Sequence, residues 1–209
     1  MKTKITKINA DWIDVKNECR NTVNKEYSDK EATSKFKTNI LISEHSPIRL
    51  IDVKWRWEGI KSWISVHFAR HWLGWDKWIS TQRDDRTGVD RNKSPQDVPV
   101  NYDGKANAQS LINVARYRLC VGCAHPETRQ YMEDLKISIK EQGEKELSDV
   151  LVPNCIYRGG CPEFKCCGYM DNFVKWCKNN EKITKEADLL DISTRYELYN
   201  AFFAEKTRA

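Results

Sequence analysis

Two neighbouring segments of the chain carry side chains that can bind an anion. Arg70 and His71 fall where an expected helix ends, and Ser80, Thr81 and Arg83 follow at a short interval. Arginine presents paired N–H donors to a phosphate, and Ser and Thr hydroxyls can add further hydrogen bonds. The pattern indicates an anion pocket, although an isolated Arg-His pair is more often only a surface feature.

A second candidate segment is the expected helix that contains Asn107, Ser110, Asn113 and Arg118. At 3.6 residues per turn, positions 107, 110 or 111, 114 and 118 share a face, and 113 lies beside it. Amide, hydroxyl and guanidinium groups on one side of a helix with an apolar opposite side can line a ligand cleft. The alternative is a solvated helix face with one capping residue.

The eight cysteines suggest a third kind of chemistry. Cys155, Cys161, Cys166 and Cys167 are separated by turns rich in Gly and Pro, and thiolates so arranged suit a tetrahedral zinc or an iron–sulfur site. Further possible ligands, Cys120, Cys123 and His125, lie upstream. Our choice of metal ligands is Cys120, Cys155, Cys161 and Cys167, with reduced structural thiols and disulfides as the alternatives.

The elements that must position these residues follow from hydrophobic periodicity. Residues 50–58 alternate as a strand that ends at Gly59, with Leu50 or Ile51, Val53, Trp55 and Trp57 on its buried face. Helices are expected over 60–73, 106–121, 126–143 and 194–205, with two more within 1–40. Residues 74–104 are expected to form a long irregular functional loop.

Six of the eight tryptophans lie between Trp55 and Trp78. We expect Trp55 and Trp57 in the core. Trp72, Trp75 and Trp78 follow the Arg-His pair, where they either pack in a core or subunit interface or stack on a ligand ring.

Composition excludes several classes of protein. The chain has 209 residues and a net charge of +5, and no window of 18 apolar residues that could span a membrane. The charge is modest and forms no continuous stripe, so nucleic-acid binding is not indicated. The N-terminal residues contain no apolar run typical of a secretory signal, so we expect a cytoplasmic protein with reduced thiols. We expect a main domain over residues 1–150 and a Cys-rich segment with a helical tail over 151–209.

Taken together, these segments resemble the flavin-dependent thymidylate synthase (ThyX) family, in a divergent branch of the kind carried by bacterial viruses. The resemblance covers about residues 40–140, in the family's order and at nearly its spacing. The matching segments are Ser43-Glu44-His45-Ser46-Pro47-Ile48, Trp57-Glu58-Gly59-Ile60, Arg70-His71, Thr81-Gln82-Arg83, Asn107-Ala108-Gln109-Ser110-Leu111-Ile112-Asn113 with Arg118, and Glu127 with Arg129.

The resemblance implies an α+β fold, with a mixed or antiparallel sheet flanked by long helices, in a homotetramer whose active sites lie between subunits. It implies FAD as cofactor, NADPH and methylene-tetrahydrofolate as co-substrates, and methylation of dUMP, or a related modification, at C5. The implied flavin contacts are Arg70, His71, Asn107 and Asn113. The implied nucleotide contacts are Ser80, Thr81, Arg83 and Arg118, with Arg70 and Arg118 as the catalytic residues.

The chain departs from the family pattern at Leu50, Trp72, Trp75 and Gln109. Each of these residues replaces a hydrogen-bond donor or a cation near phosphate, flavin or folate. A second interpretation is therefore a non-catalytic nucleotide-binding protein on the same scaffold, with the flavin site lost. A third is an interaction protein that uses the Trp-rich and Cys-rich segments.

Overall fold

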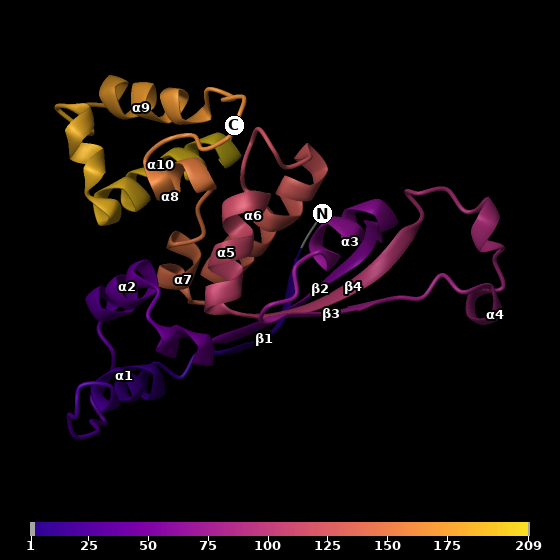
Figure 1. The fold of residues 1–209 in the computed structure, drawn as a ribbon, viewed down its shortest axis with the longest axis horizontal. Helices are drawn as coiled ribbons and strands as arrows, with labels where there is room; N and C mark the ends of the chain where they lie inside the picture. Colours follow the sequence, from indigo (N-terminus) through magenta and orange to yellow (C-terminus); the bar gives the residue numbers. More distant parts are fainter. Residues whose placement is uncertain (1–2, 209) are drawn as a thin grey trace.

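The protein is built on one antiparallel sheet, seen in a computed structural model that describes residues 3–208 (Figure 1). The four strands lie in the order β1-β2-β4-β3. They are β1 (Lys4–Asn9), β2 (Asp52–Lys61), β3 (Trp75–Ile79) and β4 (Pro99–Asn107).

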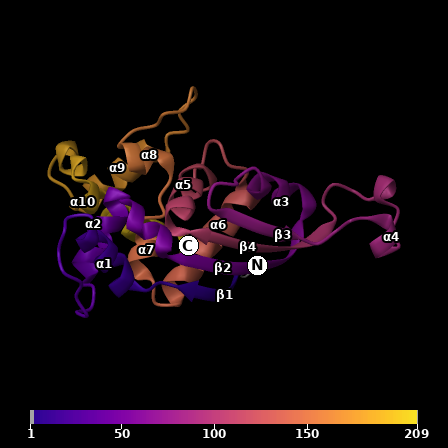
Figure 2. The same cartoon turned by 60° about the horizontal axis from the view of Figure 1, so that its bottom comes forward.

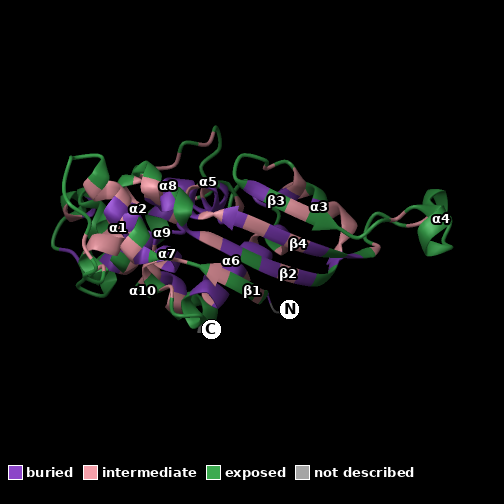
Figure 3. Cartoon of the chain, turned by 90° about the horizontal axis from the view of Figure 1, so that it is seen from below, coloured by how far each residue is buried: buried purple, intermediate pink, exposed green. Residues whose placement is uncertain are grey.

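Helices cover one face of the sheet (Figure 1). The side chains of β2 and β4 that point to the other face are mostly polar or charged. Helices α3 (Ser62–Ala69), α5 (Ala108–Arg118) and α6 (Pro126–Glu141) lie over the sheet, and α1 (Trp12–Asn21) and α2 (Ser34–Ser43) lie beyond one end of it. Buried and exposed residues alternate along β2 and β4, as Figure 3 shows. On the polar face Arg56 pairs with Asp103 at 3.3 Å, across the β2–β4 ladder.

The core under the helices is aromatic. Trp55, Trp57 and Trp75 are at most 1% exposed, and the Trp55 and Trp75 ring centroids lie 4.8 Å apart. The Trp75 indole N–H donates a hydrogen bond to the Tyr102 hydroxyl at 2.8 Å. Burial of this many aromatic side chains on one sheet face supplies much of the driving force for folding.

A close backbone approach in this core allows a sharp stability prediction. Gly104 on β4 lies opposite Trp55 on β2, and a Cβ added at Gly104 would come within 2.3 Å of Trp55 Cζ2. Gly104→Ala must therefore displace a fully buried indole, and we expect it to lower the free energy of unfolding by about 2–3 kcal/mol. Urea denaturation measures the loss. Gly160→Ala, with open space around the new Cβ, is the matched control and is expected to change stability by less than about 0.5 kcal/mol.

The segment between Gly74 and Gly104 differs from the sequence prediction. It was predicted to be irregular, but it contains β3 and most of β4, and β3 pairs with β4 from Trp75↔Ala106 to Ile79↔Tyr102. The strands are short and contain Asp and Lys, so their stability comes from the neighbouring strands rather than from local propensity. Only the connection between them, with α4 (Asp84–Thr87) and a 3-10 turn (Arg91–Lys93), is irregular, and it extends as an arm away from the body (Figures 1 and 2).

Other boundaries also differ from the predictions. Strand β1 was not predicted, and Gly59, with φ +65°, lies at a register shift inside β2 rather than at its end. Ile51 is buried and Leu50 is 42% exposed, which decides between those two candidates. Helices α3 and α5 are shorter than predicted, whereas α6 begins at the predicted residue.

The C-terminal third of the chain is helical and packs against α5 and α6. Besides the 3-10 turn in the arm, one 3-10 turn (Glu186–Leu190) precedes α10 in this part of the chain, and another (Ser46–Leu50) precedes β2. Arg195 is 4% exposed and donates to the carbonyls of Ile156 and Tyr157, at 2.6 and 3.0 Å, which ties α10 to α8. Among the described residues, no helix is long and apolar enough to cross a membrane. The helices of this part are α7 (Lys145–Asp149), α8 (Asn154–Arg158), α9 (Tyr169–Asn179) and α10 (Ile192–Arg208).

Candidate functional site

Arg118 joins two of the segments that the sequence singled out. It lies in the last turn of α5, and its guanidinium donates from Nε to His71 Nε2 at 3.0 Å and from Nη2 to the His67 carbonyl at 2.6 Å. The side chain is half-buried, and burial lowers the pKa of Arg118. An arginine stays protonated at any physiological pH. The Arg118 guanidinium therefore places a fixed positive charge next to the C-terminal end of α3.

His71 is held as a neutral imidazole. Because an arginine N–H can only donate, His71 Nε2 must accept, and the ring proton then sits on Nδ1. Burial, together with the charges of Arg118 and Lys77, lowers the pKa of His71 to about 4. Lys77 also donates to the His71 carbonyl at 2.7 Å, so cations from β3 and α5 both fix this residue.

A cavity of about 180 Å³ opens beside this group. Its lining combines the two predicted segments: Arg70, His71 and Trp72 from the end of α3, and Ser110 and Asn113 from α5. The structure therefore brings the Arg-His pair and the polar face of the second helix to one place, as the ligand-cleft interpretation requires. Trp72 is 72% exposed at its rim.

Arg70 also lines a second, larger cavity of about 380 Å³. This cavity lies between α3 and the base of the arm, where His67, Gln82 and Arg91 contribute polar groups. The Gln82 side-chain nitrogen is buried and has no hydrogen-bond partner among the described protein atoms. An unpaired buried amide donor is costly, which is a reason to expect a ligand acceptor opposite it.

The structure does not bring Ser80, Thr81 and Arg83 to Arg118, and none of the three lines the two cavities at Arg70. Ser80 lies directly after β3 at the base of the arm, and its Oγ accepts a hydrogen bond from the backbone N–H of Asn101 on β4 at 2.9 Å. Arg83 is exposed and makes two hydrogen bonds to Asp85, at 2.9 and 2.8 Å. Thr81 Oγ1 accepts from the Arg83 backbone N–H. Within one chain, Gln82 is the residue of this segment that lines a cavity with Arg70.

Asn107 is the capping residue that the alternative interpretation of this helix expected. It caps α5 by accepting from the Ser110 N–H at 2.9 Å, and its amide packs on Gly74, where an added Cβ would lie 2.5 Å from Asn107 Nδ2. Gly74 has φ +62°, so both the backbone conformation and the contact require glycine there. Asn113 is exposed on α5 and accepts from Arg116 at 3.1 Å.

The cysteines chosen from the sequence lie near the C-terminal end of α5, but among the described residues Cys120 is the only one of the four in a group whose ligand atoms are close enough to share a metal ion. Cys120 and Cys155 are buried, and burial followed by the neighbouring thiols of Cys120, Cys161 and Cys167 raises the pKa of Cys155 to about 12. Cys123 lies in the same place: the ligand atoms of Cys120, Cys123 and Glu163 are within 4.8 Å of one another.

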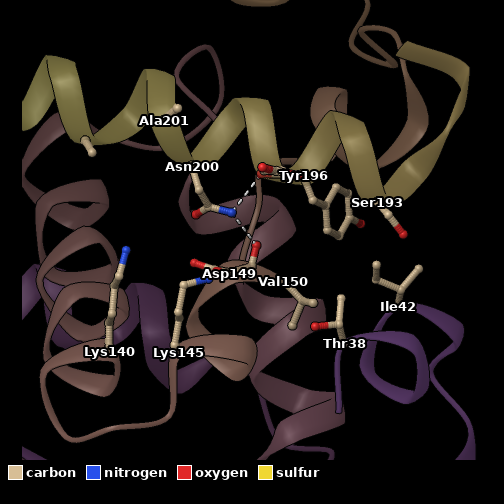
Figure 4. A pocket seen from close by; sticks show the side chains of 12 residues that line it. Thr38, Ile42, Lys140, Lys145, Asp149, Val150, Ser193, Tyr196, Asn200 and Ala201 are labelled. Atoms are coloured by element: carbon tan, nitrogen blue, oxygen red, sulfur yellow. Dashed lines mark hydrogen bonds and ion pairs between the residues drawn. The ribbon is translucent and has the colours of Figure 1, made fainter. Parts of the chain in front are cut away.

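The largest cavity described, about 400 Å³, lies elsewhere, between α2, α7 and α10 (Figure 4). Its lining includes Lys145, Tyr196 and Asn200, none of which belongs to the predicted motifs. Asn200 Nδ2 donates to the Asp149 and Tyr196 carbonyls, both at 2.8 Å, and these bonds are drawn in Figure 4. Asn200 and the Lys145–Asp149 pair therefore already have protein partners, and none of the sequence motifs lies here, which makes this cavity a poorer candidate than the cavities at Arg70.

Compared by sequence, the chain matches no protein-family model and no curated protein. Compared by structure, it is similar to the flavin-dependent thymidylate synthase ThyX of Helicobacter pylori in two crystal structures with FAD and dUMP. These align with TM-scores of 0.56 and 0.58 at 14% and 13% identity, over 72% of this chain and 99% of theirs. A UMP/dUMP methylase PolB from Streptomyces cacaoi, bound to 5-Br dUMP, aligns with a TM-score of 0.56 at 12% identity, over 73% of this chain and 96% of that one.

These matches establish the fold. The chain has the α+β fold of the flavin-dependent thymidylate synthases, as the motif order predicted, with its sheet wholly antiparallel. The structural alignment covers nearly the whole length of the similar proteins, 96–99% of each chain.

Sequence reasoning overlooked several members of the site. His67 and Lys77 lie on either side of the Arg70-His71 pair in the sequence but belong to no motif, and their contacts with Arg118 and His71 are seen only in the folded chain. Cys123 was among the possible ligands but not among the four chosen, although Cys120 and Cys123 form a Cys-x2-Cys pair around Gly122, a spacing typical of metal knuckles.

Proposed function

We propose that the protein binds a pyrimidine deoxynucleotide such as dUMP at the Arg70–Arg118 site and modifies its C5 carbon with the help of a flavin. The observation that carries the proposal is the junction of Arg118 with His71 beside two cavities that share Arg70. The likeness to proteins whose structures contain dUMP and 5-Br dUMP adds support.

The charges of the site suit a nucleotide. Arg70 and Arg91 line the larger cavity, and its volume falls within the range of about 300–1,000 Å³ that is usual for small-molecule sites. A guanidinium can bind a phosphate with two parallel hydrogen bonds. The unpaired Gln82 amide N–H matches an acceptor such as a phosphate or a pyrimidine carbonyl oxygen.

The residues around the smaller cavity fit part of a flavin. Arg70 and His71 offer donors, Asn113 offers an amide, and Trp72 offers an exposed aromatic face. When bound, FAD reduced by NADPH would supply the electrons that convert a one-carbon unit from methylene-tetrahydrofolate to a methyl group. The protein's own part is to hold the nucleotide, keep His71 neutral and fix the cations in place.

We propose further that the site is completed by another copy of the chain, in a homotetramer. At about 180 Å³, the cavity beside His71 is too small for a flavin, and the apolar side chains of Trp72 and Leu73, both above 70% exposed, stand at its rim. Arg83 is exposed and immediately precedes α4, on the arm that extends away from the body (Figure 2), where a neighbouring copy would be in reach.

We expect Arg83→Ala to weaken dUMP binding at protein concentrations where the oligomer forms. Loss of a charge-assisted bond to phosphate would cost about 1.5–3 kcal/mol. Light scattering gives the oligomeric state, and calorimetric titration of dUMP gives the affinity. Arg86→Ala, an exposed arginine on the same arm, is the control. A clean monomer at micromolar concentration would contradict the shared site.

The test of the proposed function is the absorbance of the purified protein with and without added FAD, followed by dUMP titration. We expect flavin absorbance near ~450 nm, a property of the cofactor, and dUMP binding that is stronger in the flavin-loaded protein. A colourless protein that takes up no FAD but binds dUMP would establish the nucleotide-binding alternative. A protein that binds neither would refute the proposal.

A further inference from the structure

We propose that the end of α5 and the Cys-rich segment of residues 155–167 hold one structural metal ion or small metal cluster through thiolates. Cys120 and Cys123 form the first pair of ligands. The second pair comes from Cys155, Cys161 and Cys167. This centre is separate from the nucleotide site and does not depend on the function proposed for it.

The first half of the centre has the form of a knuckle. Cys120 and Cys123 are separated by Val121 and Gly122, and their sulfurs lie within 4.8 Å of each other and of a Glu163 carboxylate oxygen. Thiolate pairs at this spacing bind one ion from one short turn, which is why they recur in structural zinc sites.

The second half approaches the knuckle from the other segment. A Cβ added at Gly122 would lie 3.1 Å from Cys167 Cβ and 3.3 Å from its Sγ, so the knuckle is in contact with Cys167 and glycine is what permits that approach. Cys155 lies at the start of α8 and is near the thiols of Cys120, Cys161 and Cys167. Five of the eight cysteines, Cys120, Cys123, Cys155, Cys161 and Cys167, therefore lie near one another and come from three stretches of sequence.

The physical surroundings favour a metal over packed free thiols. Residues 159–168 form a loop with little regular structure, and Phe164 at its tip is fully exposed. Such a loop buries too little apolar surface to order itself. Metal–thiolate bonds would supply that free energy directly. All eight cysteines are unpaired in the described chain.

The position of the centre gives it a consequence for the nearby site. Cys120 lies two residues after Arg118, and the Arg118 charge acts on the Cys123 thiol. A metal at this point would fix the turn between α5 and α6 and so hold the C-terminal end of the helix that carries Arg118.

The test is elemental analysis of full-length protein purified without added metal, combined with thiol titration in the native state. We expect about one zinc per chain, or iron with acid-labile sulfide and a brown colour. We also expect the Cys120 and Cys123 thiols to be protected from thiol reagents in the native protein. A mercurial reagent should then release the metal in proportion to the number of thiols that it modifies. Either metal supports the thiolate centre, and the two are told apart by colour and sulfide content.

Variants locate the centre. Cys120→Ser and Cys123→Ser should each lower the metal content at least tenfold, whereas Cys19→Ser and Cys177→Ser, on α1 and α9, should retain it. If the knuckle variants fail to fold, the mercurial release from the unmodified protein still decides the question. Metal-free protein whose thiols all react at once, a mass showing disulfides without metal, or full metal content in both knuckle variants would overturn the proposal.

Discussion

Arg118→Ala is expected to weaken dUMP binding by about 10- to 150-fold, which corresponds to about 1.5–3 kcal/mol for a lost charge-assisted interaction. The effect has two sources in the structure. The variant removes a half-buried cation, and it leaves His71 Nε2 and the His67 carbonyl without their donor. Calorimetric titration with dUMP measures the change.

Arg116→Ala is the matched control for this experiment. Arg116 is on the same helix two residues away, but its guanidinium pairs with Glu44, lies 3.6 Å from the centroid of the Tyr157 ring and donates to Asn113, and among the described residues it makes no hydrogen bond to His71 or His67. We expect it to lose stability with little change in dUMP affinity. Arg118→Lys should restore the charge without both hydrogen bonds and so recover part of the affinity. Equal affinity of the native protein and Arg118→Ala would remove this residue from the site.

The second large effect is expected at Lys136, a lysine buried in the helical part of the molecule. It is 2% exposed and donates to the Ser148 carbonyl at 2.6 Å and to Asn200 Oδ1 at 2.7 Å. Burial lowers the pKa of Lys136 to about 7, despite the opposing charge of Asp149. Both hydrogen-bond partners are neutral, so nothing in direct contact compensates the loss of water around the ammonium.

The sign of the pH dependence follows from this lowered pKa. Between pH 7 and about 10.5 the unfolded chain binds a proton at Lys136 that the folded protein does not, so the free energy of unfolding rises with pH. Below pH 7 both states are protonated and the contribution is constant. Between pH 7 and 9 we expect the stability of the native protein to rise by about 2 kcal/mol relative to Lys136→Met.

Urea denaturation of both proteins at pH 7, 8 and 9 measures this difference. Subtracting the two free energies of unfolding removes the contributions of the titratable groups that both proteins share. Lys140→Met, an exposed lysine one turn further along α6, is the control and should show no such trend. A difference between the native protein and Lys136→Met that stays flat across this range would mean that Lys136 remains charged when buried.

The sequence by itself determined the fold class and the two segments that meet at the site. Motif order predicted the fold, because Arg70-His71 and the helix ending at Arg118 are local patterns that can be recognised without overall sequence similarity, and the structural matches at 12–14% identity confirm that fold. The strand periodicity around Trp55 and Trp57 also predicted the core correctly, since alternation on a half-buried strand is a local property.

Only the tertiary structure decided the remainder. Strands β3 and β4 contain polar residues, and they form because β4 pairs with β2 on one side and with β3 on the other, which no local pattern records. The same is true of Lys77 and His67, which reach the site from β3 and α3, and of Gln82, whose cavity exists only where the arm meets α3. Asn107 is a further case: the sequence left open a ligand contact or a helix cap, and in the folded chain its side-chain oxygen caps α5, because the first N–H groups of a helix need an acceptor.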